Sequence, residues 1–87
     1  MTYRFTNKAR KQFLKLDKSV QNRISKYMDE VASLANPRAR GKGLSGNLSE
    51  FWSYRVGDYR IVCRIQDNIL QIEVVKVGHR RDVYDSW

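Results

Sequence analysis

The chain has 87 residues, enough for one small domain (residues 1–87) whose core lies near the lower size limit for independent stability. It carries 17 Lys and Arg against nine Asp and Glu, a formal net charge of +8 at pH 7. A single cysteine excludes an internal disulfide, and with a single histidine it leaves no metal-ligand cluster of the usual kind, so neither a metal nor a cofactor is expected. No apolar run is long enough to span a membrane or to form a signal peptide, which favours a cytoplasmic protein without a membrane partner.

The positive charge is concentrated in the first half of the chain. Residues 1–46 hold eleven basic and three acidic residues, whereas residues 47–87 hold six of each. A basic surface of this strength attracts polyanions, and nucleic acid is the first candidate. An acidic protein partner, or solubility alone, is the alternative explanation.

Residues 2–6 alternate in the manner of a short strand. Thr6 or Asn7 can then cap a helix. Along this helix, Ala9, Phe13 and Leu16 recur at the i, i+4, i+7 spacing of a single apolar stripe.

A second helix follows directly, with Asp17 as its cap and Asn36-Pro37 as its end. Its longer stripe consists of Val20, Ile24, Tyr27, Met28, Val31 and Leu34. The tight connection between the helices predicts an antiparallel pair whose stripes cover one apolar surface.

Basic residues line the polar sides of both helices and the loop after them. On the helices they are Lys8, Arg10, Lys11, Lys15, Lys18, Arg23 and Lys26, and in the loop they are Arg38, Arg40 and Lys42. The helical residues lack the compensating Glu at i, i+4 that a merely solvated helix tends to have. The glycines of the loop permit flexibility or close approach to a backbone. We therefore expect these ten residues to contact the backbone of a large nucleic acid such as RNA.

The sequence predicts a β meander of three strands, at residues 51–56, 59–66 and 69–77. The dipeptides Gly57-Asp58 and Asp67-Asn68 suit two-residue hairpin turns, because these residues tolerate positive φ. Two-residue turns would place Arg55 opposite Arg60, Ser53 opposite Val62, and Arg64 opposite Gln71. Like charges directly opposite each other destabilise a sheet, so the Arg55–Arg60 pair indicates a bound anion.

The same register sorts the side chains onto two faces. One face is apolar, with Trp52, Tyr54, Ile61, Cys63, Ile65, Leu70, Ile72 and Val74. The other is mostly polar and free to face water or a ligand, with Ser53, Arg55, Arg60, Val62, Arg64, Gln71, Glu73 and Val75. The predicted fold class is α+β, in the order β-α-α-β-β-β, with two N-terminal helices on one face of a small, mainly antiparallel sheet. Cys63 is then a core residue rather than a nucleophile.

The end of the third meander strand carries the remaining candidates. The predicted register places Val75 opposite Arg60, so Gly78 and His79 leave the sheet beside the two arginines. Arg55, Arg60, His79, Arg80 and Tyr84 then converge on one concavity. Such a set suits RNA cleavage, in which guanidinium groups stabilise the crowded phosphate while imidazole or phenol transfers protons.

Three ordered segments resemble a known family. They are Asn-Leu-Ser-x-Phe-Trp-Ser-x-Arg-Val at residues 47–56, Tyr-Arg-Ile-Val at 59–62, and Val-Gly-His-Arg-Arg-Asp-Val-Tyr at 77–84. Together with the order of elements, they resemble the RelE branch of the RelE/ParE toxin superfamily of type II toxin–antitoxin modules. The resemblance implies a metal-independent endoribonuclease that cuts mRNA in the A site of the 70S ribosome and leaves a 2′,3′-cyclic phosphate or a 3′-phosphate. It also implies a RelB-like antitoxin as partner, with operator DNA bound only through the antitoxin complex.

The resemblance also suggests roles for individual residues. Arg60 matches the phosphate-stabilising arginine of the family, Arg80 the basic residue after Val-Gly-x, and Tyr84 the terminal tyrosine, while His79 matches a histidine of many members. Some relatives carry a lysine pair where this chain has Ser53 and Arg55, and others carry a glutamate base that this chain lacks. The general base therefore stays open between His79 and Tyr84.

Two other functions compete with the nuclease. A ParE-like inhibitor of gyrase would use the same fold without nuclease chemistry, and fold similarity does not separate the two. A basic nucleic-acid-binding module without catalysis would depend on the helical lysines and would tolerate loss of His79 and Tyr84.

Overall fold

The computed structural model of the chain describes residues 1–81, which form a five-stranded mixed sheet and two helices. The elements are β1 (Thr2–Phe5), α1 (Asn7–Leu14), α2 (Lys18–Ser33), β2 (Lys42–Gly43), β3 (Trp52–Val56), β4 (Tyr59–Gln66) and β5 (Gln71–His79). The strands lie in the order β1-β5-β4-β3-β2, with β1 parallel to β5 and the other neighbours antiparallel. The predicted fold class and order of elements are confirmed, and the two-residue strand β2 is an addition inside the region expected to be a loop.

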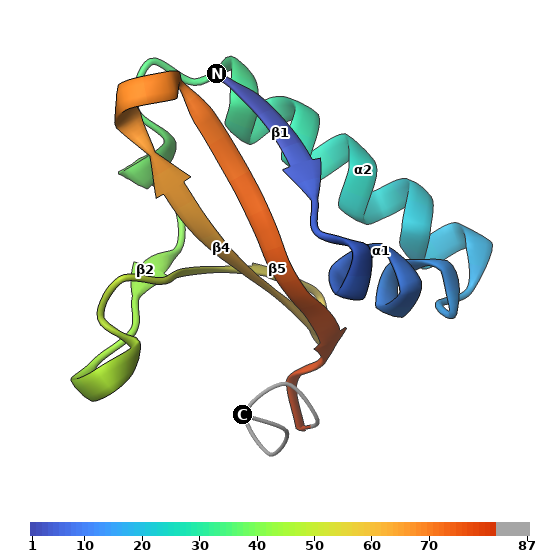
Figure 1. Cartoon of the computed structure of the whole chain (residues 1–87). Coiled ribbons are helices and arrows are strands. Elements are labelled where there is room, and N and C mark those ends of the chain that lie inside the picture. The colour runs from blue at the N-terminus through green and yellow to red at the C-terminus, as the bar shows by residue number, and fades with distance from the viewer. Residues whose placement is uncertain (82–87) are drawn as a thin grey trace.

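Both helices begin where the sequence predicts. The Thr6 hydroxyl accepts a hydrogen bond from the Ala9 amide at 3.1 Å and caps α1. Asp17 occupies the cap position of α2, although its side chain makes no capping hydrogen bond. The helices lie on one side of the sheet (Figure 1).

The core fills the space between the helices and the sheet. Its buried members are Ala9, Val20, Ile24, Met28, Val31, Tyr54, Val56, Ile61, Cys63, Ile72, Val74 and Val77. Cys63 is fully buried, and burial raises the pKa of its thiol. The expectation that Cys63 is a core residue is confirmed. No helix within residues 1–81 is both long and apolar enough to cross a membrane.

The β3–β4 hairpin has the predicted two-residue turn. Gly57 adopts a φ of 58°, and Arg55 lies opposite Arg60, with Ser53 opposite Val62. The turn chemistry of Gly57-Asp58 was therefore sufficient to define this register.

The β4–β5 turn is longer than predicted, and the predicted register is wrong. Residues 67–69 form a 3₁₀ turn, after which Leu70 takes a left-handed conformation with a φ of 52°. Arg64 therefore lies opposite Glu73 rather than Gln71, which replaces a neutral partner with an ion pair of 3.3 Å. Leu70, predicted on the apolar face, is 63% exposed at the tip of this turn.

A β-bulge at Val62/Cys63 changes the register again in the last part of β5. Cys63 lies opposite Val74 and Val62 opposite Lys76, so Val75 is the extra residue. The prediction that Val75 lies opposite Arg60 is wrong. Gly78 has that place, and His79 lies opposite Tyr59.

The sheet face away from the helices is more covered than predicted. Ser53 is 1% exposed, Val62 0% and Lys76 3%. The polar side chains on this face that reach solvent therefore stand around a buried centre, and Arg55 is exposed at one end.

Candidate functional site

A pocket of about 310 Å³ opens where β2, β3 and β4 meet the edge of the sheet. It is lined by Tyr27 from α2, Gly41 and Lys42 at β2, Ser53 and Arg55 from β3, and Arg60 from β4. Three of these six residues are cations and none is acidic. A pocket with this lining selects anions.

The pair Arg55 and Arg60 is central to the pocket. The β3–β4 register holds the two residues directly opposite each other on the face away from the helices. Arg55 is exposed and its Nε donates to the Gly57 carbonyl at 3.0 Å, whereas Arg60 is half-buried. Two guanidinium groups side by side repel each other, and an anion between them removes this repulsion.

Ser53 adds a polar group to the same pocket. Its side chain is almost fully buried, and Oγ has no hydrogen-bond partner within residues 1–81. Buried hydroxyl groups are nearly always hydrogen-bonded. An unsatisfied hydroxyl on a residue of the pocket lining is a candidate hydrogen-bonding group for a ligand.

His79 lies at the end of β5, next to Gly78, the cross-strand partner of Arg60. Its cross-strand partner is Tyr59, which packs against the core, and the two rings meet edge to face at 5.8 Å. His79 does not line the pocket. Its Nδ1 accepts a hydrogen bond from the Arg81 amide at 3.3 Å, so in the neutral imidazole the proton is on Nε2.

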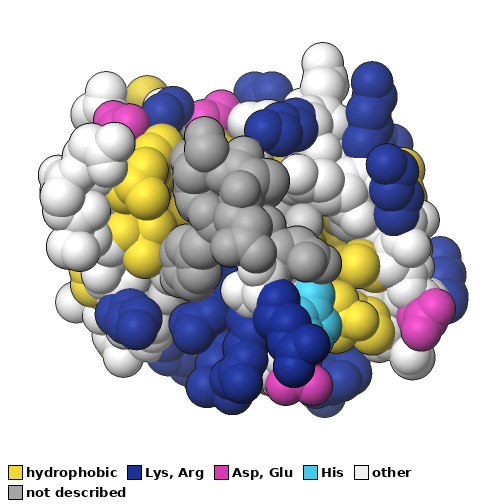
Figure 2. All heavy atoms as spheres, turned by 90° about the horizontal axis from the view of Figure 1, so that it is seen from below, with side chains coloured by type: hydrophobic (Ala, Val, Ile, Leu, Met, Phe, Trp, Pro, Cys, Tyr) yellow, Lys and Arg dark blue, Asp and Glu magenta, His cyan; other side chains and the backbone are white. Residues whose placement is uncertain are grey.

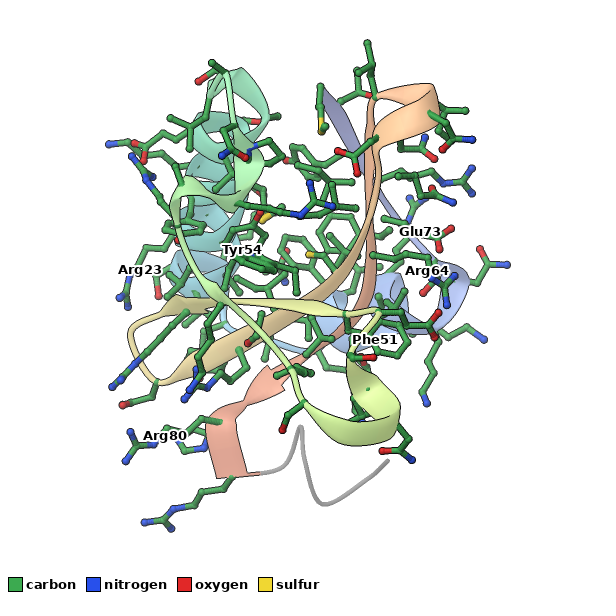
Figure 3. The ribbon with its side chains drawn as sticks, turned by 90° about the vertical axis from the view of Figure 1, so that its left-hand side faces the viewer. Arg23, Phe51, Tyr54, Arg64, Glu73 and Arg80 are labelled. Atoms are coloured by element: carbon green, nitrogen blue, oxygen red, sulfur yellow. The ribbon has the colours of Figure 1, made fainter. Side chains whose placement is uncertain are left out.

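Arg80 is tied to the hairpin turn by its backbone. Its amide donates to the Asp58 carbonyl at 2.8 Å, and its side chain is exposed (Figure 3). This bond holds the end of β5 beside the turn that carries Arg55 and Arg60. The last of the five predicted catalytic residues, Tyr84, lies outside the described residues.

The seven basic residues of the helices are all exposed, as a binding surface requires. Figure 2 views the molecule from the end where β5 finishes, and Lys and Arg side chains gather along one side of that view.

Two basic residues of the loop, in contrast, form ion pairs within the protein. Arg38 makes two hydrogen bonds to the Asp67 carboxylate, at 3.0 and 2.9 Å, and Arg40 pairs with Glu30 at 3.1 Å.

These ion pairs attach the loop to the rest of the protein, a role of Arg38 and Arg40 that the sequence pattern did not predict. The hydrogen bonds from Arg38 lower the pKa of the Asp67 carboxyl. The guanidinium of Arg40 also lies over the Tyr27 ring, 5.6 Å from its centre.

Four pocket residues were missed by sequence reasoning as members of this site, and Gly41 and Ser53 were not among the candidate residues at all. Tyr27 was expected only in the core, and Lys42 only on the general basic surface. A strand of two residues leaves almost no signal in a sequence, so the pairing of Lys42 with Ser53 was not predictable.

Comparison with known proteins identifies the family of this chain. The family model described as ParE toxin of the type II toxin–antitoxin system parDE matches residues 3–84. The chain belongs to the RelE/ParE superfamily of type II toxins. The family expected from the three sequence segments is confirmed.

Individual relatives of this RelE/ParE toxin agree. It is 32% identical to toxin RelG of Mycobacterium tuberculosis over 83 residues, which cover 95% of this chain and 94% of RelG. Among solved structures, the RelBE2 toxin–antitoxin complex of M. tuberculosis matches with a TM-score of 0.82 at 32% identity, covering 91% of this chain and 90% of the other. A free-state variant of E. coli RelE matches with a TM-score of 0.77 at 26% identity, covering 97% of this chain and 90% of the other.

Proposed function

We propose that this toxin is a ribosome-dependent, metal-independent endoribonuclease that cleaves mRNA in the A site and so inhibits translation. The observation that carries the proposal is the pocket in which Arg55 and Arg60 face each other with no acidic residue in its lining. The scissile phosphate of an mRNA is the anion that would separate these guanidinium groups. The resemblance to RelG and RelE supports the same reaction class.

The proposed chemistry is transesterification at phosphorus. The 2′-oxygen of the RNA attacks the phosphate, the bond to the 5′-oxygen breaks, and a 2′,3′-cyclic phosphate and a 5′-hydroxyl result. Arg55 and Arg60 would stabilise the charge that builds on the non-bridging oxygens, where preorganised donors have their largest effect. Arg80 would add charge from the neighbouring turn.

Proton transfer needs two further groups. The 2′-hydroxyl must lose a proton and the departing 5′-oxygen must gain one. We assign the donor role to His79 as the imidazolium, which gives its Nε2 proton to the 5′-oxygen and returns to the neutral form in which Nδ1 accepts from the Arg81 amide. RNA leaving the pocket over the hairpin turn would reach the end of β5. With His79 as the donor, we propose the other candidate, Tyr84, as the base that takes the proton of the 2′-hydroxyl.

The partner of this toxin, in our proposal, is a RelB-like antitoxin. The structures that it resembles include RelBE toxin–antitoxin complexes. A net charge of +8 suits a partner that is largely acidic. Operator DNA would be bound only by the complex, through the antitoxin.

The test is a map of mRNA 5′ ends in cells after induction of the toxin. The nuclease predicts new ends at fixed positions within translated codons, and it predicts their absence when Arg60→Ala is induced to the same level. Gyrase inhibition is the other function known for this fold, and the family model bears the ParE name. Intact mRNA together with trapped gyrase would replace the proposal with that function.

A further inference from the structure

The segment of residues 37–43 is held against the rest of the protein at many points. The Tyr54 hydroxyl donates to the Pro37 carbonyl at 2.6 Å, and the Trp52 indole donates to the Arg40 carbonyl at 2.7 Å. Ion pairs join Arg38 to Asp67 and Arg40 to Glu30 (2.9 and 3.1 Å). The sequence left flexibility and close approach as alternatives for this glycine-containing loop, and the structure shows close approach.

Gly41 is where the segment comes nearest to β3. Its φ is +75°, and a Cβ built there would overlap the Ser53 carbonyl oxygen and lie 2.8 Å from the Trp52 indole nitrogen. A residue with a side chain could not bring the backbone this close. The glycine thus lets the next residue, Lys42, pair with Ser53 as part of β2.

Lys42 is the cation that this arrangement delivers. Arg38 and Arg40 are used in ion pairs, whereas Lys42 has no acidic partner within residues 1–81. It lines the pocket with Arg55 and Arg60, and its cross-strand partner is Ser53, whose buried Oγ also lacks a hydrogen-bond partner among those residues. An ammonium group and an unsatisfied hydroxyl side by side form a site for a phosphate oxygen.

We propose that Lys42 and Ser53 bind the RNA phosphate next to the scissile one, so that the pocket holds two consecutive phosphates. This inference rests on the proposed nuclease function and adds a substrate-binding residue to it. Arg55 and Arg60 hold the phosphate that is cut, and Lys42 fixes the position of the strand. The rigid attachment of residues 37–43 matters because a phosphate contact aligns a substrate only if the contact itself is fixed.

The test neutralises one phosphate at a time. Two mRNAs are prepared, each with one uncharged methylphosphonate, at the linkage before or after the scissile bond. The purified full-length protein cuts each mRNA on programmed ribosomes. Single-turnover rates are measured for the wild type and for Lys42→Ala. We expect Lys42→Ala to slow cleavage of unmodified mRNA roughly ten- to a hundredfold, the usual effect of losing a hydrogen bond to a charged group. One of the two modified mRNAs should be slowed in the same way with the wild type. With Lys42→Ala, that modified mRNA should be cut as fast as the unmodified mRNA, because the substitution and the methylphosphonate remove the same contact.

A charge-matched control separates this contact from general attraction. Arg4 is exposed on β1, at the opposite edge of the sheet from β2, so Arg4→Ala removes one positive charge far from the pocket. It should respond to both methylphosphonates as the wild type does, and Lys42→Arg should retain part of the rate. A structural role of Lys42 would instead lower the thermal stability and leave the response to the modified mRNA unchanged.

Each outcome has one meaning. Independent losses, in which the methylphosphonates slow Lys42→Ala as much as the wild type, overturn the inference, as does full activity of Lys42→Ala. A wild type that cuts no mRNA overturns the proposed nuclease function, and the inference with it.

Discussion

Arg60 and Arg64 stand four residues apart on the same strand and on the same face, yet their surroundings differ. Arg64 pairs with Glu73 at 3.3 Å and Glu50 at 3.7 Å, and it lies over the Phe51 ring, 5.3 Å from its centre (Figure 3). Arg60 lines the anion pocket, opposite Arg55 on one side and Gly78 on the other. The neighbours, rather than the residue type, separate a structural arginine from a candidate catalytic one.

This pair provides a matched test. Arg60→Ala should lower the rate of mRNA cleavage on ribosomes by about 10²–10³-fold, since it removes a donor to the developing charge. Arg64→Ala should leave the rate within a few-fold of the wild type and affect mainly stability. Far-ultraviolet circular dichroism checks that both variants fold. Equal losses of activity in the two variants would show that Arg60 acts only through general charge.

Tyr54 links the core to the segment that carries Lys42. Its ring is fully buried, burial raises the pKa of its hydroxyl, and that hydroxyl donates to the Pro37 carbonyl. Tyr54→Phe should reduce the free energy of unfolding by about 1–3 kcal/mol, because the buried carbonyl loses its donor. Urea denaturation with an unchanged m value measures this effect. An unchanged midpoint would mean that the carbonyl finds another donor.

At the scale of elements, the sequence predicted what depends on local chemistry. The Thr6 cap, the α2 stripe and the Gly57-Asp58 turn each need only neighbouring residues. All three are confirmed, except that Leu34, the last member of the predicted stripe, lies just beyond the end of α2. Failures occurred where distant contacts decide. The β4–β5 turn is longer than Asp67-Asn68 suggested, and the longer turn goes with the ion pair of Arg64 with Glu73. No local sequence pattern predicts the bulge in β5.

The candidate site followed the same division. Arg55 and Arg60 were placed together correctly because a tight turn joins their strands. His79 does not line the pocket with them, and its predicted position required two registers in succession, of which the second was wrong. Lys42 was missed as a pocket residue because its strand depends on contacts with Trp52 and Ser53 rather than on its own sequence.

Gly41 and Gly46 form a pair of glycines with which to test the placement of β2. Both have positive φ, but a Cβ at Gly46 would have nothing within 4 Å. Gly46→Ala should cost only the left-handed strain of about 1–2 kcal/mol and leave cleavage intact. Gly41→Ala should cost more and should slow cleavage at least as much as Lys42→Ala, since it moves β2 from β3. Thermal unfolding and single-turnover rates are the measurements, and equal behaviour of the two variants would contradict this role of Gly41.

At the scale of the whole molecule, the single cysteine reports on the core. Cys63 is fully buried and its raised pKa keeps the thiol protonated, so the native protein should react with a thiol reagent only when the core opens. We expect labelling to be slower than in denaturant by orders of magnitude. A ligand that binds the folded state, such as the antitoxin, should slow it further. Rapid labelling of the native protein would contradict the packing between helices and sheet.

Much of the positive charge of the molecule lies on two surfaces, one on the helices and one at the sheet edge. The helices present an exposed basic surface, and the sheet edge provides a pocket with its own cations. We infer that the first attracts the ribosome and its RNA over a long range, while the second binds the phosphates that react.

The central claim is that the Arg55–Arg60 pocket promotes attack by a 2′-oxygen on the neighbouring phosphate. The most direct measurement is single-turnover cleavage, on programmed ribosomes, of an mRNA with one 2′-deoxynucleotide at the scissile position. We predict that the unmodified mRNA is cut to a 2′,3′-cyclic phosphate and a 5′-hydroxyl, and that the 2′-deoxy mRNA stays intact at that position. Cleavage of the 2′-deoxy mRNA at the same bond would contradict the claim.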